Sequence, residues 1–138
     1  MHVLQEIHRW LRTDGVLLDL HSEPEQPRVE VYVDRIPRAY LGLVDNSSTV
    51  GNIHRARATL AAIVEEGWFT TGSSSVFDFA SHFPRVDDWL RYRQDRRSTS
   101  IVDPAIIERA RETLAEVPSG ELRVSERLRA TRLDRCLQ

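Results

Sequence analysis

The sequence predicts an α/β fold, because stretches with apolar residues at helical spacing alternate along the chain with strand-like stretches. Residues 2–12 have helical spacing, and the nearly continuous apolar run at 16–20 is typical of a strand buried on both faces of a sheet. Helical stretches separate three of the expected strands and are long enough for parallel crossover connections. A chain of 138 residues has room for one domain, which we expect at 1–138.

An inserted β-hairpin is expected at 22–51, between the first strand and the next helix. Val29, Val31 and Val33 alternate with other residue types, which is the period-two pattern of a strand. Residues 34–35 form the expected turn, after which the chain returns as the second arm of the hairpin.

The second half of the chain is expected to be partly helical. The elements are, in order, a helix at 53–66 with Asn52 as its N-cap, a strand at 76–83, helices at 86–97 and 104–117, and a last strand at 121–130. The last two helices form a helical excursion at 86–118, and Asp103 followed by Pro104 is a strong start signal for the second of them. The serine run at 73–75 is interpreted as a flexible loop.

Composition and charge exclude several classes of function. All 19 basic residues are Arg, which excludes chemistry that requires Lys, and 21 acidic residues give a formal net charge of −2. This balance is not the basic footprint of a nucleic-acid-binding protein. No apolar run approaches the ~20 residues that span a bilayer, and the charged N-terminus is unlike a signal peptide. We therefore expect a cytoplasmic protein with neither a nucleic-acid nor a membrane partner.

The common cofactor and catalytic motifs do not occur in the sequence. It contains no G-x-G-x-x-G, no G-x-x-x-x-G-K-[ST] and no G-x-S-x-G. The five histidines have no ligand spacing, and the single cysteine, Cys136, gives neither an intrachain disulfide nor a metal cluster. We expect no metal site.

A small-molecule site is predicted from four residues. Asp19 and His21 end the first expected strand, where ligands bind in open α/β sheets. They are two residues apart and point to the same side, and a His beside a carboxylate suits general-base chemistry. His82 and Trp89 border the helical excursion and would line the same pocket. Alternatively, Asp19 caps a backbone amide, His21 is solvated and Trp89 is a core anchor.

Two further features are open to a functional or a structural interpretation. The cluster Arg91, Arg93, Arg96 and Arg97 with Tyr92 either contacts phosphate or forms a solvated helix face with interleaved Asp residues. Separately, Glu126 lies on the expected apolar face of the last strand, where a carboxylate needs a partner, solvent or a raised pKa. We expect Glu126 to form an ion pair with an Arg.

Residues 4–18 resemble the helix, turn and strand in the second half of class I S-adenosylmethionine-dependent methyltransferases. The family pattern is approximately L-x-E-x-x-R-v-L-k/r-p-G-G followed by an apolar strand. The matching residues in this sequence are Glu6, Arg9, Leu11, Arg12 and Gly15. Thr13 and Asp14 replace the usual Pro-Gly, so the chain departs from the family in the turn itself.

The resemblance implies a partial Rossmann-like sheet of mixed type. The family's fifth strand is followed by a helix and a sixth strand, and an antiparallel seventh strand is inserted beside the fifth. The family's glycine-rich turn and ribose-binding acid have no counterpart here, so no adenosylmethionine-binding residue carries over and no cofactor is expected for the isolated chain. The chain is then a methyltransferase-related domain without methyl-transfer activity of its own. The alternative is a non-catalytic small-ligand-binding or protein-interaction module.

The same resemblance bears on the oligomeric state. In the family sheet a further strand flanks the one that matches residues 16–20, and this sequence offers no such strand. An exposed apolar edge is a template for association. We therefore expect a homodimer that covers this edge. The local alternative is that the hairpin at 29–44 folds back and pairs with it.

Overall fold

The chain forms two compact units. The computed structural model describes residues 3–137, and within them it contains four helices and five strands. Of the described residues, the first unit contains 3–23, 51–77 and 128–137, and the second unit contains 24–50 and 78–127. The second unit thus contains most of the expected hairpin insertion at 22–51 and the whole expected helical excursion at 86–118.

All five strands belong to one antiparallel sheet. The strands are β1 (Val16–Ser22), β2 (Arg28–Val33), β3 (Ile36–Leu43), β4 (Phe69–Phe83) and β5 (Glu121–Arg135). Their order is β1-β5-β2-β3, and β4 also pairs with β5. Strand β1 pairs with β5 from Val16↔Asp134 to Ser22↔Leu128, and β2 pairs with β5 from Arg28↔Ser125 to Tyr32↔Glu121.

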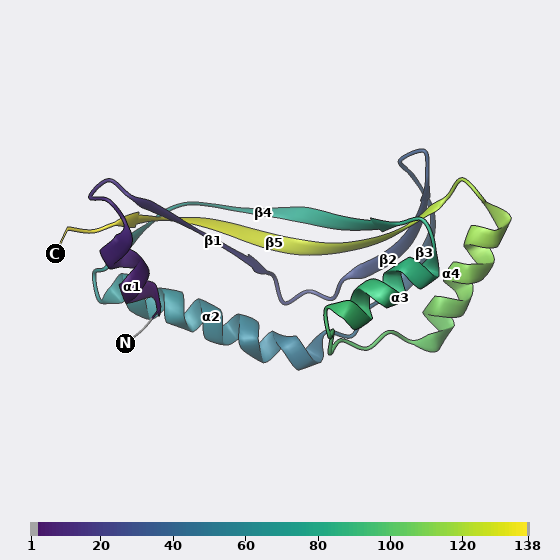
Figure 1. Cartoon of the computed structure of the whole chain (residues 1–138), viewed down its shortest axis with the longest axis horizontal. Helices are drawn as coiled ribbons and strands as arrows, with labels where there is room; N and C mark the ends of the chain where they lie inside the picture. The colour runs from purple at the N-terminus through teal and green to yellow at the C-terminus, as the bar shows by residue number, and fades with distance from the viewer. Residues whose placement is uncertain (1–2, 138) are drawn as a thin grey trace. The chain divides into compact units, whose positions relative to one another are not determined.

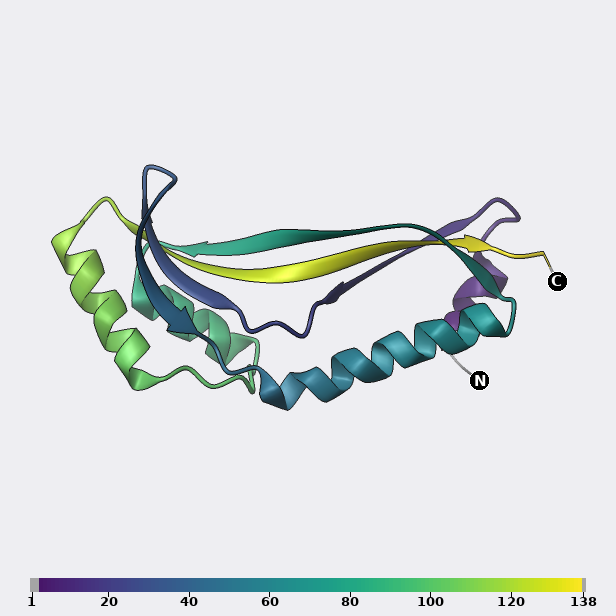
Figure 2. The same cartoon turned by 180° about the vertical axis from the view of Figure 1, so that it is seen from behind.

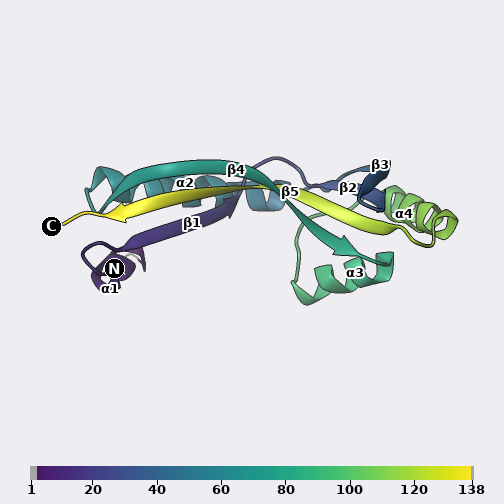
Figure 3. The ribbon, with the colours of Figure 1, turned by 90° about the horizontal axis from the view of Figure 1, so that it is seen from above.

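Strand β4 is antiparallel to β5 as well. The Cys136 N–H donates to the Trp68 carbonyl at one end of the pair, and His82 contacts Glu121 at the other end. In the first unit β5 therefore lies between β1 and β4 (Figure 3). The expected antiparallel last strand beside the first strand is confirmed. The parallel neighbours expected of a mixed sheet are wrong, because β5 separates β1 from β4.

Two helices cover one face of the sheet in the first unit (Figure 1). They are α1 (Val3–Trp10) and the part of α2 (Ser47–Glu65) that belongs to this unit. Ile63, Phe69 and Leu133 are buried between the layers, and Leu4, Leu11, Leu17, Leu60, Val64 and Trp68 pack around them. The helix predicted at 2–12 is thus observed from Val3, and residue 2 lies outside the described residues.

His8 is a structural residue of this core. Its side chain is buried, and its ring lies edge-on to the rings of Trp68 and Phe69, with centroids 5.1 and 5.3 Å away. The His8 Nε2 is 2.9 Å from the Cys136 carbonyl oxygen, which can only accept, so Nε2 carries the proton. This bond ties α1 to the residue that follows β5.

The second unit packs a hairpin against two helices (Figure 2). The hairpin β2–β3 turns through Asp34 and Arg35, whose φ angles of 50° and 66° are those of a type I′ turn. Helices α3 (Val86–Asp95) and α4 (Pro104–Glu116) bury Trp89, Ile106 and other apolar residues against it. The predicted start of α4 is confirmed, since the Asp103 carboxylate accepts from the Ala105 N–H at 2.8 Å.

The starts of α2 and β4 differ from the prediction, and β5 continues to Arg135, whereas the last strand was expected to end at 130. Helix α2 begins at Ser47, where the Asp45 carboxylate accepts from the Ser47 N–H at 2.9 Å, so Asn52 lies inside the helix and is not its cap. Residues 73–75 belong to strand β4 and are not a flexible loop. Pairing with β5 decides the second case and outweighs the local preference of Ser and Gly for turns.

Strand β1 is buried on one face only, which corrects the expectation of burial on both faces. Leu17, Asp19 and His21 are partly covered, whereas Val16, Leu18 and Leu20 have exposed fractions of 44%, 64% and 56%. Helices α1 and α2 pack on the side of Leu17, and no described element of this unit covers the opposite side.

None of the described helices combines the length and apolar character that crossing a membrane requires.

Candidate functional site

The end of β1 carries a hydrogen-bonded aspartate–histidine pair. Asp19 and His21 are two residues apart on one strand, so both side chains point to the partly covered face of the sheet. The His21 Nδ1 lies 2.6 Å from the Asp19 Oδ2, and both side chains are mostly buried. The two residues named from the sequence as a carboxylate–histidine pair are therefore in direct contact.

Arg57 of α2 fixes the protonation pattern of the His21 ring. Its Nε–H points to the His21 Nε2 at 3.4 Å. Because a guanidinium can only donate, Nε2 accepts and the ring proton resides on Nδ1, where it is donated to Asp19. His21 is thus held as the tautomer whose free lone pair is on Nε2. A ligand that displaces Arg57 would meet a hydrogen-bond acceptor that can also take a proton.

Glu23 lies next to this pair and joins two arginines. Its Oε1 is 2.7 Å from the Arg57 Nη2 and 2.6 Å from the Arg129 Nε of β5. Hydrogen bonding to Arg57 and then to Arg129, together with their charges, lowers the pKa of Glu23 from its ordinary value of 4.5, against the opposing effect of burial. The carboxylate is therefore ionised at neutral pH.

The polar chain continues into β4 and β5. The Arg129 Nη1 donates to the Ser74 Oγ at 3.2 Å, and the Ser74 Oγ lies 3.2 Å from the Thr131 Oγ1. Residues from four elements and from the segment after β1 thus form one connected polar cluster. We call Asp19, His21, Glu23, Arg57, Ser74, Arg129 and Thr131 the β1-end cluster.

A cavity of about 480 Å³ lies beside this cluster in the first unit. His21, Arg57, Arg129 and Thr131 form its polar wall. Its apolar wall comes from Leu60, Ala61, Val64 and Leu133. A volume of this size is within the range of small-molecule sites, and the combination of an apolar wall with a few polar groups is typical of them.

The other two predicted site residues lie in the second unit. Trp89 is almost fully buried in the core there and also lines a separate cavity of that unit. His82 is half-exposed on β4, and its Nδ1 lies 2.8 Å from the Glu121 Oε1. The structure therefore brings Asp19 and His21 together, and the membership of His82 and Trp89 in the same pocket stays a prediction.

Five members of the β1-end cluster were missed by reasoning from the sequence: three charged residues, and the hydroxyl-bearing Ser74 and Thr131. Glu23 follows β1 in a loop, Arg57 is one of two Arg residues on α2, and Arg129 is one of several Arg residues on β5. Only the position of Glu23 beside the strand end was a usable signal. The pairing of Glu23 with two arginines depends on segments that are far apart in sequence.

Within residues 3–137, no group of three or more His, Cys, Asp or Glu side chains is arranged to hold a metal ion. Comparison of the chain with protein-family models, with curated proteins and with solved structures gives no match.

Glu23→Gln is expected to lower the free energy of unfolding at pH 7 by about 1–3 kcal/mol, because the variant removes the charge that pairs with Arg57 and that strengthens the hydrogen bond from Arg129. The pKa of Glu23 is lowered in the folded state, so its contribution is complete above pH 4.5 and is lost as the pH falls through the folded-state pKa. The stability difference between wild type and variant should therefore shrink with acidification. Urea unfolding between pH 7 and pH 3 measures it.

Glu65→Gln is the matched control, since Glu65 is exposed and lies on the rim of the same cavity. Its effect at pH 7 should stay within about 0.5 kcal/mol. Equal losses in the two variants, or a Glu23→Gln loss that does not change with pH, would contradict the assigned role of Glu23.

Proposed function

We propose that this chain is a methyltransferase-related domain that does not transfer methyl groups by itself. The observation that carries the proposal is the strand order of the first unit, β1-β5-β4, with β5 antiparallel to both neighbours. The resemblance of residues 4–18 to class I methyltransferases implies an antiparallel last strand beside the strand that matches β1, and β5 occupies this position.

The division of the chain into units supports the same proposal. With the hairpin and the helical excursion set aside in the second unit, the first unit contains α1, β1, most of α2 and the paired ends of β4 and β5. This series of helix, strand, helix, strand and final antiparallel strand is the order that the resemblance implies. The added elements then occupy two connections, before α2 and between β4 and β5.

The β1-end cluster is the proposed small-molecule contact of this domain. Asp19 and His21 lie near the carboxyl end of β1, and His21 lines the cavity of the first unit. A cavity of this size with an apolar wall and a few polar groups is typical of small-molecule sites. We assign them to substrate binding, with His21 as an acceptor oriented by Asp19.

The isolated chain is expected to show no binding of S-adenosylmethionine in isothermal titration calorimetry, and no methyl transfer. Cofactor binding requires fixed backbone donors at a glycine-rich turn and an acidic partner for the ribose, and the sequence contains neither motif. Circular dichroism of the same sample verifies that the protein is folded. A 1:1 isotherm with a dissociation constant in the low micromolar range would overturn the proposal.

A second candidate function, a protein-interaction module that dimerises, is favoured by the outer edge of β1. This edge has no partner strand among residues 3–137. The hairpin pairs with β5 and not with β1, so the alternative prediction that the hairpin covers this edge is wrong. One face of β1 presents Val16, Leu18 and Leu20 to solvent, and Trp10 of the neighbouring helix is 80% exposed. Proteins rarely leave such an apolar edge unprotected.

A second copy of the chain fits this edge in a symmetric way. Two β1 strands related by a two-fold axis at Leu18 would be antiparallel, with Leu18 opposite its equivalent and Val16 opposite Leu20. The three exposed apolar side chains of each copy would then lie opposite those of the other copy on one face of a continuous sheet. Asp19 would oppose Leu17, so this register brings no two carboxylates together.

Light scattering after size exclusion is expected to give a mass near twice 15.9 kDa for the wild type. Leu18→Lys should give a monomer, because two like charges would lie directly opposite each other. Since Leu18 is exposed, the variant should keep the stability of the wild type.

Ile36→Lys is the control for the dimer, because Ile36 is also an exposed aliphatic residue, 67% exposed on β3. This variant should remain dimeric. A wild-type monomer at tens of micromolar, or a Leu18→Lys protein that stays dimeric, would contradict the assignment of the β1 edge.

A further inference from the structure

The second unit contains a cavity that the β1-end cluster does not use. Its volume is about 370 Å³, which is within the range of small-molecule sites. Helix α3, the loop that follows it, and the neighbouring ends of β4 and β5 supply its walls, and all of its lining residues belong to the second unit.

Three aromatic rings line one part of this cavity. Trp89 and Phe83 are 2% and 8% exposed, so they form a rigid wall in contact with the core. Tyr92 is 41% exposed, and its ring centroid lies 5.4 Å from that of Phe83 with a tilt of 55° between the planes. Flat aromatic walls favour a planar ligand, because ring–ring contacts stabilise beyond the apolar area they bury.

Two guanidinium groups line the cavity beside the aromatic rings. The Arg93 Nη1 donates to the Ser100 Oγ at 2.9 Å, and its Cζ lies 5.8 Å from the centroid of the Trp89 ring. Burial lowers the pKa of Arg93, because the guanidinium cation is partly removed from water. A desolvated cation attracts an anion more strongly than one in bulk water.

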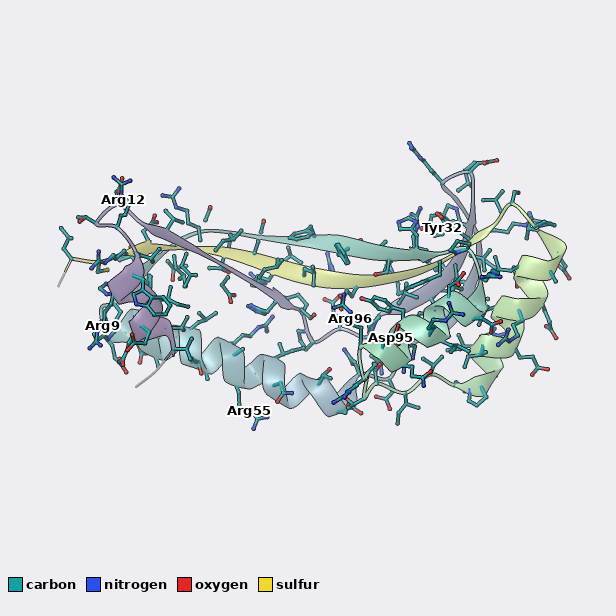
Figure 4. The ribbon with its side chains drawn as sticks, viewed as in Figure 1. Arg9, Arg12, Tyr32, Arg55, Asp95 and Arg96 are labelled. Carbon is teal, nitrogen blue, oxygen red and sulfur yellow. The ribbon has the colours of Figure 1, made fainter. Side chains whose placement is uncertain are left out.

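Arg96 has a guanidinium group that is available to bind a ligand. It directly follows α3 (Figure 4), is exposed, and its Cζ lies 5.1 Å from the centroid of the Tyr92 ring. Within residues 3–137 no carboxylate forms an ion pair with it. The nearby hydroxyls of Ser98 and Ser100, whose Oγ atoms are 2.8 Å apart, add hydrogen-bond donors to the same wall. This combination is suited to binding a carboxylate.

Glu126 restricts the charge of the ligand. It lines the cavity beside Val124, so a carboxylate of the protein faces the same space as the two guanidinium groups. Its charge disfavours ligands with several negative charges, such as diphosphates, while a single carboxylate held at Arg96 is tolerated.

We propose that this cavity binds a small aromatic monocarboxylate, with its ring against the wall formed by Tyr92, Phe83 and Trp89 and its carboxylate at Arg96 and Ser98. The aromatic wall selects against aliphatic acids, and the guanidinium selects against neutral aromatic compounds. The inference rests on residues of the second unit alone, so it stands or fails independently of the methyltransferase-related function.

Indole-3-carboxylate is the probe for this proposal, used with the full chain in calorimetry and in ¹⁵N-resolved NMR titration. Saturable 1:1 binding is expected at sub-millimolar concentration, with a shift of the Trp89 indole N–H but not of the Trp10 and Trp68 indole N–H. Indole-3-carboxamide, which has the same shape without the charge, should bind about tenfold more weakly, as expected from the loss of a charge-assisted contact. Cyclohexanecarboxylate should be weaker as well, because it lacks the aromatic face.

Arg96→Ala should weaken binding of indole-3-carboxylate by about tenfold. Arg91→Ala is the matched control, because Arg91 is exposed on the same helix and does not line the cavity. It removes the same charge and should leave binding unchanged. Equal effects of the two variants, equal affinities for carboxylate and carboxamide, or no binding by the folded wild type would overturn the proposal.

Discussion

The backbone hydrogen bonds of β5 are the constraint on which both units depend. The later residues of this strand pair with β1 and its earlier residues pair with β2, while β4 pairs with β5 as well. An antiparallel ladder cannot shift by one residue without moving every side chain to the other face. The pairing of β5 therefore sets which residues face α2 in the first unit and which face α3 in the second.

The position of β5 also determines which polar groups meet. Arg129 reaches Glu23 because β1 pairs with this part of β5, and Glu23 in turn reaches Arg57 on α2. A mostly buried carboxylate between two guanidinium groups connects the end of β1 to the helix that covers it. In the second unit the same strand supplies Val124 and Glu126 to the other cavity. Both candidate ligand sites are thus positioned by one strand.

The local elements could be predicted from the sequence, whereas their pairing could not. The hairpin at Asp34 and the start of α4 at Asp103 follow from turn and capping chemistry, which acts within a few residues. The alternation in β5 predicted one buried face for the whole strand. Instead Leu122 is buried in the second unit and Leu133 in the first, on positions of opposite parity.

In the candidate site, too, the local contact could be predicted from the sequence and the tertiary contacts could not. Asp19 and His21 share one strand, so their contact follows from spacing alone. Glu23, Arg57 and Arg129 come together only through tertiary pairing, and no local pattern distinguishes them from the other charged residues. The apolar run at 16–20 suggested burial on both faces, because hydrophobicity alone does not separate a covered face from an exposed one.

Amide hydrogen exchange tests residue by residue the proposal that the outer edge of β1 accepts the β1 strand of a second copy. The Arg135 N–H donates to the Gly15 carbonyl, and hydrogen-bonded pairs alternate along an antiparallel ladder, so the amides of Leu17 and Asp19 face β5. The amides of Leu18 and Leu20 face the open edge. At concentrations where the dimer forms, all four amides should be protected, and dilution should release Leu18 and Leu20 alone. Rapid exchange of Leu18 and Leu20 at the highest concentration, with Leu17 and Asp19 still protected, would contradict the account.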